Sequence, residues 1–405
     1  MKPLLPVAEA VQRLLNPAQP VSTTERVGLA QAANRVLAAE LKARITQPPF
    51  DSSAMDGYAL RTADALEIGS ELTVIGTASA GHAFDGNVGP GETVRIFTGA
   101  PVPEGADTVL IQEDAEVLKS NRIRTAFNVT QGRHIRPRGQ DFTQDETVLD
   151  AGTRLSFADL TVAAAMNHAD LTVYRKPLVA ILATGDELVP PGGDPEVAQI
   201  IASNTFGVAA LARQAGADVL DLGIVQDDDT LIRAAIGKAI AAEADTLVTL
   251  GGASVGDHDL VQAALKAEGM ALDFWRIAMR PGKPLMVGNI GPMQVLGLPG
   301  NPVASLVCSL LFLEPLIHKL GHQPPRSREI TVTSATALKA NDVRQDYLRA
   351  RFIRHEDGKP VAEAFTKQDS SMMKIMAKSD CLIIRPPHAP ELSAGAECKA
   401  IRLRD

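Results

Sequence analysis

The sequence predicts a multidomain chain that combines a doubly wound α/β domain with β domains, and three observations support this prediction. Its 405 residues exceed what a single hydrophobic core normally organises. Between residues 177 and 325, short apolar runs alternate with helical segments, which is typical of a parallel sheet with helices on both faces. Short β-prone runs separated by Gly and Pro turns fill residues 46–146 and return over residues 326–405.

The N-terminal part of the chain is expected to be helical, with a β domain inserted into it. Three segments carry the apolar spacing of a helix, namely residues 6–15, 28–41 and 153–167. We therefore assign helical linker segments to residues 1–45 and 147–176. The β domain at residues 46–146 would then separate the two parts of the linker.

The α/β domain over residues 177–325 shows three strand-like runs, each followed by a helical segment. The strands are expected at residues 178–183, 218–225 and 246–250. Ser203 can cap a helix that runs to about residue 214, Asp229 can cap one that runs to residue 243, and a third helix ends near residue 268. Asn301 followed by Pro302 predicts the start of a long apolar helix.

The composition excludes several classes of protein and site. A net charge of −8 with mixed signs gives no general attraction for nucleic acid or for an anionic membrane. Cys308, Cys381 and Cys398 are far apart in the sequence, which argues against a disulfide framework or a zinc site and fits a reducing compartment. The most apolar stretch, residues 302–313, is shorter than the roughly 20 residues of a membrane span, and no signal peptide is evident. We therefore expect a cytoplasmic protein.

Three loops that follow the predicted strands are rich in chemically active residues. In doubly wound sheets, ligands bind beyond the carboxyl ends of the strands. Glycines there let backbone N–H groups approach a phosphate, while carboxylates repel it unless a Mg²⁺ ion bridges the two. The loops are Thr184–Glu187, Asp227–Asp229 and Gly251–Asp259. Their combination predicts a magnesium-dependent site for a phosphorylated ligand.

Each loop also has a simpler interpretation. Taken alone, Asp227–Asp229 is more often a solvated helix cap, and Gly251-Gly252 can merely close a tight turn. Neither a dinucleotide fingerprint nor a P-loop is present, because Gly282-Lys283 is followed by Pro284 rather than by Ser or Thr. The convergence of three such loops on one sheet edge is what favours a functional site.

Further candidate loops are rigid and polar. Residues 279–284 place Arg280 and Lys283 among prolines, which favours an oxyanion pocket over a flexible, solvated pair of cations. Residues 298–305 lead into a helix whose N-terminus could face the same anion, although capping alone explains Asn301. The β domain adds polar loops, each more often structural when taken alone, at residues 48–59, 97–103 and 136–141.

Eight of these segments together resemble the molybdopterin molybdenumtransferase family, which includes bacterial MoeA and the E domain of gephyrin. They are PPFDSSAMDGYA, FTGAPVPEGAD, RGQD, LATGDEL, GIVQDD, GGASVGDHD, MRPGKP and LPGNPVAS. They follow the family's order over residues 48–305, so the match is more specific than any one motif. The resemblance implies four parts: an extended helical linker, the inserted β domain, a MogA-like α/β domain and a C-terminal β barrel.

The resemblance also implies a reaction and its partners. Members of the family insert molybdate into adenylylated molybdopterin, with Mg²⁺ assisting, and release AMP to give active molybdenum cofactor. They act as homodimers whose active site lies between the α/β domain of one subunit and the β domain of the other. A MogA-like adenylyltransferase would supply the substrate, and molybdoenzymes would accept the product.

The family pattern assigns catalytic roles to carboxylates from both domains. They are Asp56, Asp141, Glu187, Asp227 and Asp259. Metal ligands are expected among Asp227, Asp228 and Asp259, and the position directly after the GIV motif favours Asp227 over Asp228. Which of the carboxylates acts as an acid or a base is not readable from the sequence.

The same resemblance assigns substrate binding to a larger set of residues. Arg280 and Lys283 would hold molybdate through charge-assisted hydrogen bonds to its oxygens. The other residues come from the strand-end loops, the start of the apolar helix and one loop of the β domain. They are Thr98, Thr184, Gly185, Ser203, Gly251, Gly252, Ser254, Pro299, Asn301, Pro302 and Ser305.

Two other functions fit parts of this pattern. One is a MogA-like molybdopterin adenylyltransferase, which charges the pterin and stops there. The roughly 150 residues before the α/β domain, with their own polar loops, argue against it. The other is a non-enzymatic scaffold of the kind that gephyrin forms. A scaffold need not keep the family's carboxylates, whereas this chain keeps all of them.

Overall fold

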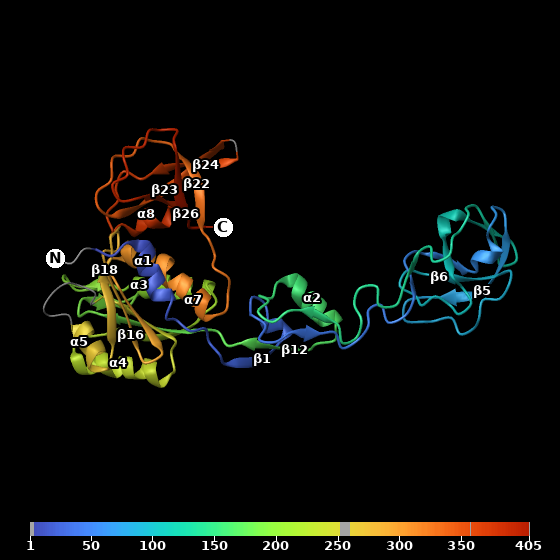
Figure 1. The fold of residues 1–405 in the computed structure, drawn as a ribbon, viewed down its shortest axis with the longest axis horizontal. Helices are drawn as coiled ribbons and strands as arrows, with labels where there is room; N and C mark the ends of the chain where they lie inside the picture. Colours follow the sequence, from blue (N-terminus) through green and yellow to red (C-terminus); the bar gives the residue numbers. More distant parts are fainter. Residues whose placement is uncertain (1–3, 252–259, 357, 405) are drawn as a thin grey trace. The chain divides into compact units, whose positions relative to one another are not determined.

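The computed structural model describes residues 4–251, 260–356 and 358–404 (Figure 1). The chain divides into two compact units. Unit 1 comprises Met1–Glu25, Asn34–Val36 and Tyr174–Asp405, and unit 2 comprises Arg26–Ala33 and Leu37–Val173. Unit 1 therefore contains the whole predicted α/β region together with the C-terminal β region, and unit 2 contains the predicted inserted β region.

A six-stranded sheet forms the centre of unit 1, with the strand order β16-β13-β17-β21-β20-β18. The first four strands of this order pair in parallel, and β20 is antiparallel to both of its neighbours. The strands are β13 (Leu178–Thr184), β16 (Asp218–Val225), β17 (Thr246–Leu250), β18 (Ala271–Arg276), β20 (Pro284–Ile290) and β21 (Met293–Leu298). The three strands predicted in this region are therefore confirmed.

Both faces of this sheet are buried, because apolar residues occupy successive positions of its central strands. In β13, Val179 and Ile181 face one core while Ala180 and Leu182 face the other. The helices of the first core are α1 (Val7–Leu15), α3 (Asn204–Gln214), α6 (Pro302–Cys308) and α7 (Glu314–Leu320). Those of the second are α4 (Asp229–Ala241) and α5 (Leu260–Ala267). Figure 1 shows these two helix groups on opposite sides of the strands, which confirms the doubly wound arrangement.

The apolar segment that begins at Pro302 is longer than the sequence indicated. The π-helical turn Ser309–Leu313 joins α6 to α7, so that Pro302–Leu320 forms 19 continuous helical residues. Length and apolar character alone would let this helix cross a membrane. The prediction that the apolar segment is too short for a membrane span was therefore wrong. However, 78% of its most apolar 18-residue window is buried inside the protein, with Val307 and Phe312 fully covered. It is a core helix of the α/β domain.

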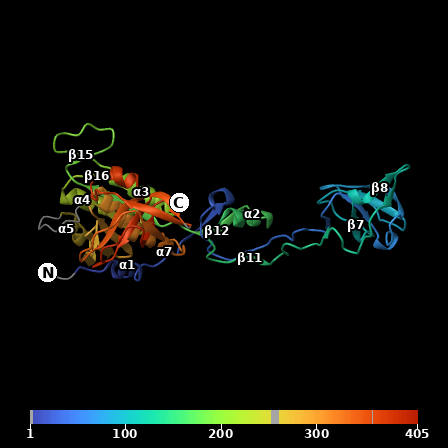
Figure 2. The same ribbon diagram turned by 90° about the horizontal axis from the view of Figure 1, so that it is seen from above.

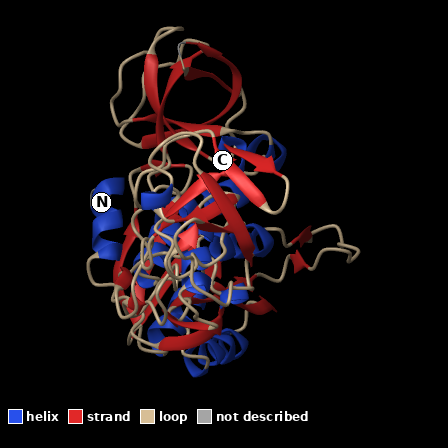
Figure 3. Ribbon diagram, turned by 90° about the vertical axis from the view of Figure 1, so that its right-hand side faces the viewer, coloured by secondary structure: helices blue, strands red, loops and turns tan. Residues whose placement is uncertain are grey.

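The C-terminal strands close into a barrel, as the fold prediction required. They follow the order β23-β24-β22-β26-β25, and β25 pairs back onto β23 (Figure 3). These strands are β22 (Glu329–Ser334), β23 (Gln345–Glu356), β24 (Lys359–Ala364), β25 (Cys381–Arg385) and β26 (Glu397–Arg402). The short strand β19 (Met279–Arg280) of the α/β region adds to the barrel by pairing with β23. Tyr347, Leu382 and Ile401 of the barrel belong to the first α/β core.

Unit 2 contains a second six-stranded sheet with the order β7-β4-β6-β5-β9-β8. Alternate residues of its central strand β4 pack into two small cores, Tyr58 and Leu60 into one and Ala59 into the other. The strands are β4 (Gly57–Leu60), β5 (Glu71–Ala78), β6 (Glu92–Ile96), β7 (Thr108–Ile111), β8 (Ala115–Leu118) and β9 (Arg122–Thr125). This sheet confirms the predicted inserted β domain.

The helix predicted over residues 28–41 is wrong. A strand, β1 (Thr24–Gly28), and one 3₁₀ turn (Leu29–Gln31) take its place, and Asn34 has a positive φ of 64°, which ends any helix. Ala32, Leu37 and Leu41 are instead buried separately in the core that also contains residues of the helix α2 (Phe157–Ala165). Tertiary packing thus overrides a high helix propensity.

The helix predicted over residues 153–167 is present but starts at Phe157. Ser156 and Asp159 form a reciprocal capping box: the Ser156 hydroxyl accepts from the Asp159 N–H, and the Asp159 carboxylate accepts from the Ser156 N–H at 2.7 Å. The Ser156 hydroxyl also donates to the Asp159 carboxylate at 2.6 Å. The bonds that this carboxylate accepts, first from the hydroxyl and then from the Ser156 N–H, lower the pKa of Asp159.

Candidate functional site

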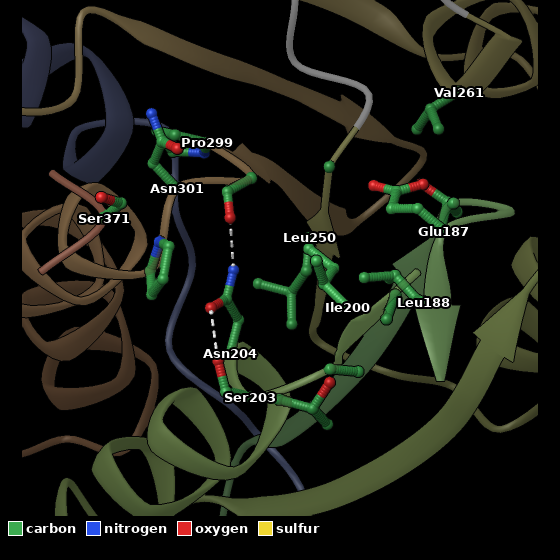
Figure 4. Close-up of a pocket in the computed structure, with 18 of the residues that line it drawn as sticks. Glu187, Leu188, Ile200, Ser203, Asn204, Leu250, Val261, Pro299, Asn301 and Ser371 are labelled. Atoms are coloured by element: carbon green, nitrogen blue, oxygen red, sulfur yellow. Dashed lines mark hydrogen bonds between the residues drawn. The ribbon is translucent and has the colours of Figure 1, made fainter. Parts of the chain in front are cut away.

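A cavity of about 1000 Å³ lies at the carboxyl ends of the parallel strands of unit 1 (Figure 4). The strands β13, β17 and β21 end at Thr184, Leu250 and Leu298, and the helices α3 and α6 begin beside it. Ten residues assigned to the site from the sequence line this cavity. They are Thr184, Gly185, Glu187, Ser203, Asp227, Gly251, Lys283, Pro299, Asn301 and Pro302.

Glu187 and Asp227 form an acidic side of the cavity. Asp227 follows β16, and its backbone N–H donates to Asp186 at 3.1 Å, which ties the loop after β16 to the loop after β13. Partial burial, and then the charges of Asp186 and Glu187, raise the pKa of Asp227. Gly185 has a φ of 146°, and a Cβ atom there would collide with the Glu187 carboxylate. The glycine therefore lets Glu187 fold back over its own loop.

The neighbouring aspartates have a different role. Asp228, and not Asp229 as predicted, is the N-cap of α4: its carboxylate accepts from the Leu231 N–H at 2.9 Å. Asp229 already lies within the helix. The structure thus brings Asp227 into the cavity and places Asp228 at a helix cap outside the cavity lining.

The floor of the cavity is made of closely packed backbone. Gly251 has a φ of 100°, and a Cβ atom there would lie 2.9 Å from the Thr184 carbonyl oxygen. Its N–H donates to the Leu298 carbonyl at 3.4 Å, and a Cβ atom on Gly300 would lie 3.9 Å from the Gly251 Cα. Three strand-end loops therefore meet backbone to backbone at the floor of the cavity.

The start of α3 forms another wall. Ser203 is the N-cap residue, but its hydroxyl makes no capping bond and instead lies 3.5 Å from the Asn204 amide oxygen and 3.3 Å from the Met373 sulfur. Asn204 also lines the cavity, and its amide nitrogen donates to the Gly300 carbonyl at 2.8 Å. The sequence analysis did not assign Asn204 to the site, because it considered only the N-cap residue Ser203 at this helix start. The amide side chain at the first helical position, beside a predicted ligand loop, is the feature that could have identified it.

The two predicted cations occupy different places. Lys283 lines the cavity, whereas Arg280 is absent from the lining. The Arg280 guanidinium donates to Asp346 at 2.8 Å and forms an ion pair with Asp342 at 3.4 Å, both at the edge of the barrel. Arg276, at the end of β18, is a second basic lining residue that the sequence analysis did not identify.

The barrel contributes side chains that sequence reasoning did not predict. Ser371 and Met373 line the cavity, and the Asp369 carboxylate accepts from the Ser371 hydroxyl at 2.5 Å and from its N–H at 2.8 Å. The Ser370 carbonyl accepts from the N–H of Val303 in α6 at 3.1 Å. Arg349, which is 1% exposed, supports this loop by donating to the Asp369 carbonyl at 2.6 Å.

One predicted contact residue is enclosed in the core of unit 1. Ser305 is fully buried in α6 and absent from the cavity lining. Within residues 4–251, 260–356 and 358–404, its hydroxyl has no hydrogen-bond partner.

Unit 2 carries the predicted residues of the β domain. The Asp56 carboxylate accepts from the Thr98 N–H at 2.8 Å and from its hydroxyl at 2.9 Å, and these bonds lower the pKa of Asp56. Asp141 is exposed, and its N–H donates to the Gln47 carbonyl at 3.0 Å. Asp56 and Thr98 therefore form one polar group.

Gly252, Ser254 and Asp259, which the sequence analysis assigned to substrate or metal, lie outside the described residues. Among the residues that the structure does describe, no three acidic, His or Cys side chains form a group that could hold a metal ion. The described carboxylates in the cavity are Glu187 and Asp227.

Comparison with known families covers nearly the whole chain. Residues 5–167 match the model of the MoeA N-terminal region (domain I and II), and residues 180–319 match the probable molybdopterin binding domain. Residues 331–403 match the MoeA C-terminal region (domain IV).

Two curated proteins of similar sequence carry the same name. The molybdopterin molybdenumtransferase of Haemophilus influenzae is 34% identical over 397 residues, covering 97% of each chain. The molybdopterin molybdenumtransferase of Bacillus subtilis is 33% identical over 415 residues, covering 99% of this chain and 94% of its own. Among solved structures, a molybdopterin biosynthesis MoeA protein from Pyrococcus horikoshii matches with a TM-score of 0.84 and 27% identity over the full length of both chains.

Proposed function

The chain belongs to the MoeA family of molybdopterin molybdenumtransferases, and from this premise we propose that it inserts molybdate into adenylylated molybdopterin with release of AMP. The observation that carries the proposal is the cavity at the strand ends, where two carboxylates, the start of α3 and a lysine meet. Similarity to curated molybdenumtransferases over 97% of the chain favours this function over a MogA-like adenylyltransferase or a gephyrin-like scaffold.

The proposed roles follow from the chemistry of each wall. The backbone floor at Gly251 and the start of α3 would receive the phosphate-bearing part of the pterin nucleotide. Lys283 would hold molybdate through a charge-assisted hydrogen bond. A carboxyl group whose pKa is raised, such as that of Asp227, keeps a proton at a higher pH than an ordinary aspartate does. In a cation-free cavity it is thus suited to proton transfer, whereas a bound cation would favour its charged form.

The acidic side of the cavity fits a Mg²⁺ ion. Glu187 and Asp227 place negative charge beside a site meant for a phosphate, and after partial burial the charges of Asp186 and Glu187 contribute to the raised pKa of Asp227. Mg²⁺ is commonly bound by one or two carboxylates together with substrate phosphate oxygens and water, so these two side chains would suffice. When bound, the ion would neutralise charge that develops on the phosphoanhydride. Asp259 remains a predicted third ligand.

We also propose that the protein is a homodimer, with Asp56, Thr98 and Asp141 of one copy completing the cavity of the other. Two observations in unit 2 support an interface. Phe157, at the start of α2, is 88% exposed, and Phe97, next to Thr98, is 38% exposed. Phe97 lies next to a residue assigned to the site, and an exposed apolar side chain there favours contact with another protein surface.

The first prediction concerns this assembly. Sedimentation at micromolar concentration is expected to give twice the chain mass of 42.9 kDa, because the proposed site needs loops from two copies. The assay should be repeated over a hundredfold dilution, with activity measured at each concentration. A monomer that keeps full specific activity would contradict the shared site.

We place the protein in the cytoplasm, where a reducing environment suits Cys308, Cys381 and Cys398, all three of which are free. A MogA-like adenylyltransferase is the proposed supplier of its substrate, and molybdoenzymes are the proposed recipients of its product.

The function itself is tested by AMP release. Purified protein given adenylylated molybdopterin and Mg²⁺ is expected to release AMP when molybdate is added, and to stop when the metal is chelated. An adenylyltransferase would instead form the adenylylated pterin from ATP without needing molybdate. A scaffold would do neither, so three outcomes separate the three functions.

A further inference from the structure

Asn204 lies between two walls of the cavity that carry different groups. Its amide nitrogen donates to the Gly300 carbonyl at 2.8 Å, and its amide oxygen faces the Ser203 hydroxyl at 3.5 Å. Figure 4 shows Asn204 rising from the start of α3 toward the loop that carries Pro299 and Asn301, with Glu187 on the far side of the cavity. Its side chain therefore joins the start of α3 to the loop that precedes α6.

The loop Pro299–Pro302 receives little other support from side chains. Asn301, the N-cap residue of α6, makes no side-chain capping bond. In the described part of the chain, Asn204 supplies the only side-chain hydrogen bond to this loop. The packing of Gly300 against Gly251 is a backbone contact with no side chain between them, so Asn204 provides the side-chain link that holds this loop to α3.

The direction of this bond matters for an anionic ligand. A carbonyl oxygen without a donor carries partial negative charge and would repel a phosphate that enters the cavity. The Asn204 amide occupies the Gly300 oxygen and holds it toward α3. We propose that Asn204 is a positioning residue, which fixes the Pro299–Pro302 loop in the form that accepts the pterin nucleotide. This inference rests on the proposed function, because it takes the cavity to be the nucleotide site.

Asn204 and Lys283 are proposed to act on different substrates. Lys283, the proposed molybdate ligand, lies just before β20, on a different element from Asn204. Loss of the Asn204 bond should therefore weaken binding of adenylylated molybdopterin and leave the molybdate requirement unchanged. A residue that merely stabilised the fold would alter neither constant selectively.

The experiment measures the dissociation constant and the KM of adenylylated molybdopterin, and the half-saturating molybdate concentration. Asn204→Ala is expected to raise the two pterin constants about threefold to tenfold, the effect of one neutral hydrogen bond. Asn204→Asp, which turns a carboxylate toward the Gly300 oxygen, should raise them about tenfold to a hundredfold. Lys283→Ala should show the reverse pattern, with the molybdate constant raised about tenfold to a hundredfold and the pterin constants unchanged.

Asn289→Asp is the matched control. Asn289 donates to the Gly291 carbonyl at 3.0 Å in the turn after β20, so the same chemistry is removed outside the cavity lining. It is expected to change no substrate constant. Unchanged pterin constants in both Asn204 variants, or an equal rise for pterin and molybdate, would overturn the inference. Failure of the wild-type protein to release AMP would overturn the proposed function instead, and the binding titration would still test Asn204 by itself.

Discussion

Glu187→Gln is expected to reduce molybdate-dependent AMP release by about a hundredfold or more, the usual size of a lost acid–base or metal-binding carboxylate. Glu187 lies at the acidic side of the cavity, where its negative charge helps to raise the pKa of Asp227. The substitution keeps the size of the side chain and removes only its charge. Because Glu187 is exposed, the melting temperature should change little.

Glu196→Gln serves as the control for this variant. Glu196 belongs to the loop between β14 (Leu188–Val189) and β15 (Ile200–Ile201), which projects from the α/β domain in Figure 2 and places Glu196 outside the cavity lining. Both variants remove one negative charge from the same domain. Retention of more than half of the activity by Glu187→Gln, or an equal loss in Glu196→Gln, would show that Glu187 has no specific role.

Gly282→Ala is expected to destabilise the protein by about 2–4 kcal/mol. Gly282 has a φ of 106°, a conformation that side chains rarely adopt, and a Cβ atom would lie 2.6 Å from the Cys308 sulfur and 3.0 Å from the Met279 methyl group. Cys308 and Met279 are both fully buried, so neither can move aside into solvent. The strain should also displace Lys283, the next residue, and so raise the molybdate requirement.

Thermal or urea unfolding of Gly282→Ala and of Gly237→Ala gives the comparison. Gly237 lies within α4, and a Cβ atom there would meet no atom within 4 Å. Alanine at this position should stabilise the protein by about 0.5–1 kcal/mol, because glycine is a poor helix former. Equal stability changes in the two variants would mean that the space around Gly282 is not limiting.

The architecture was predictable wherever local pattern and tertiary packing agree. Strands such as β13 are apolar at every position except the last, Thr184, because both faces of a doubly wound sheet are covered, and a continuous apolar run indicates that arrangement. Residues 28–41 show the opposite case. Their alanines and leucines favour a helix in isolation, but the chain buries Ala32, Leu37 and Leu41 in one core with residues of α2, which lies more than 100 residues further along the sequence.

The cavity was predictable in part, for a related reason. The ends of neighbouring parallel strands must lie together, so Thr184, Asp227 and Gly251 could be grouped from the sequence. Side chains that reach the cavity from other elements could not. Ser371 comes from the barrel, and its position depends on contacts of Asp369 and Val303 that no local pattern reveals. Arg280 was grouped with Lys283 because prolines flank both, yet its partner is Asp346 of the barrel.

The α/β region and the C-terminal barrel cannot be divided at one point of the sequence. The strand β19 belongs to the α/β region by sequence, but it pairs with β23 of the barrel. A fragment that stopped after Pro325 would leave Arg280 without Asp346 and would uncover the part of the first core that Tyr347, Leu382 and Ile401 complete. It would also lack the cavity wall formed by Ser371 and Met373. The α/β region of this chain is therefore not an independent folding unit. Replacing it with a protein that folds as a single α/β domain would not reproduce its core or its cavity.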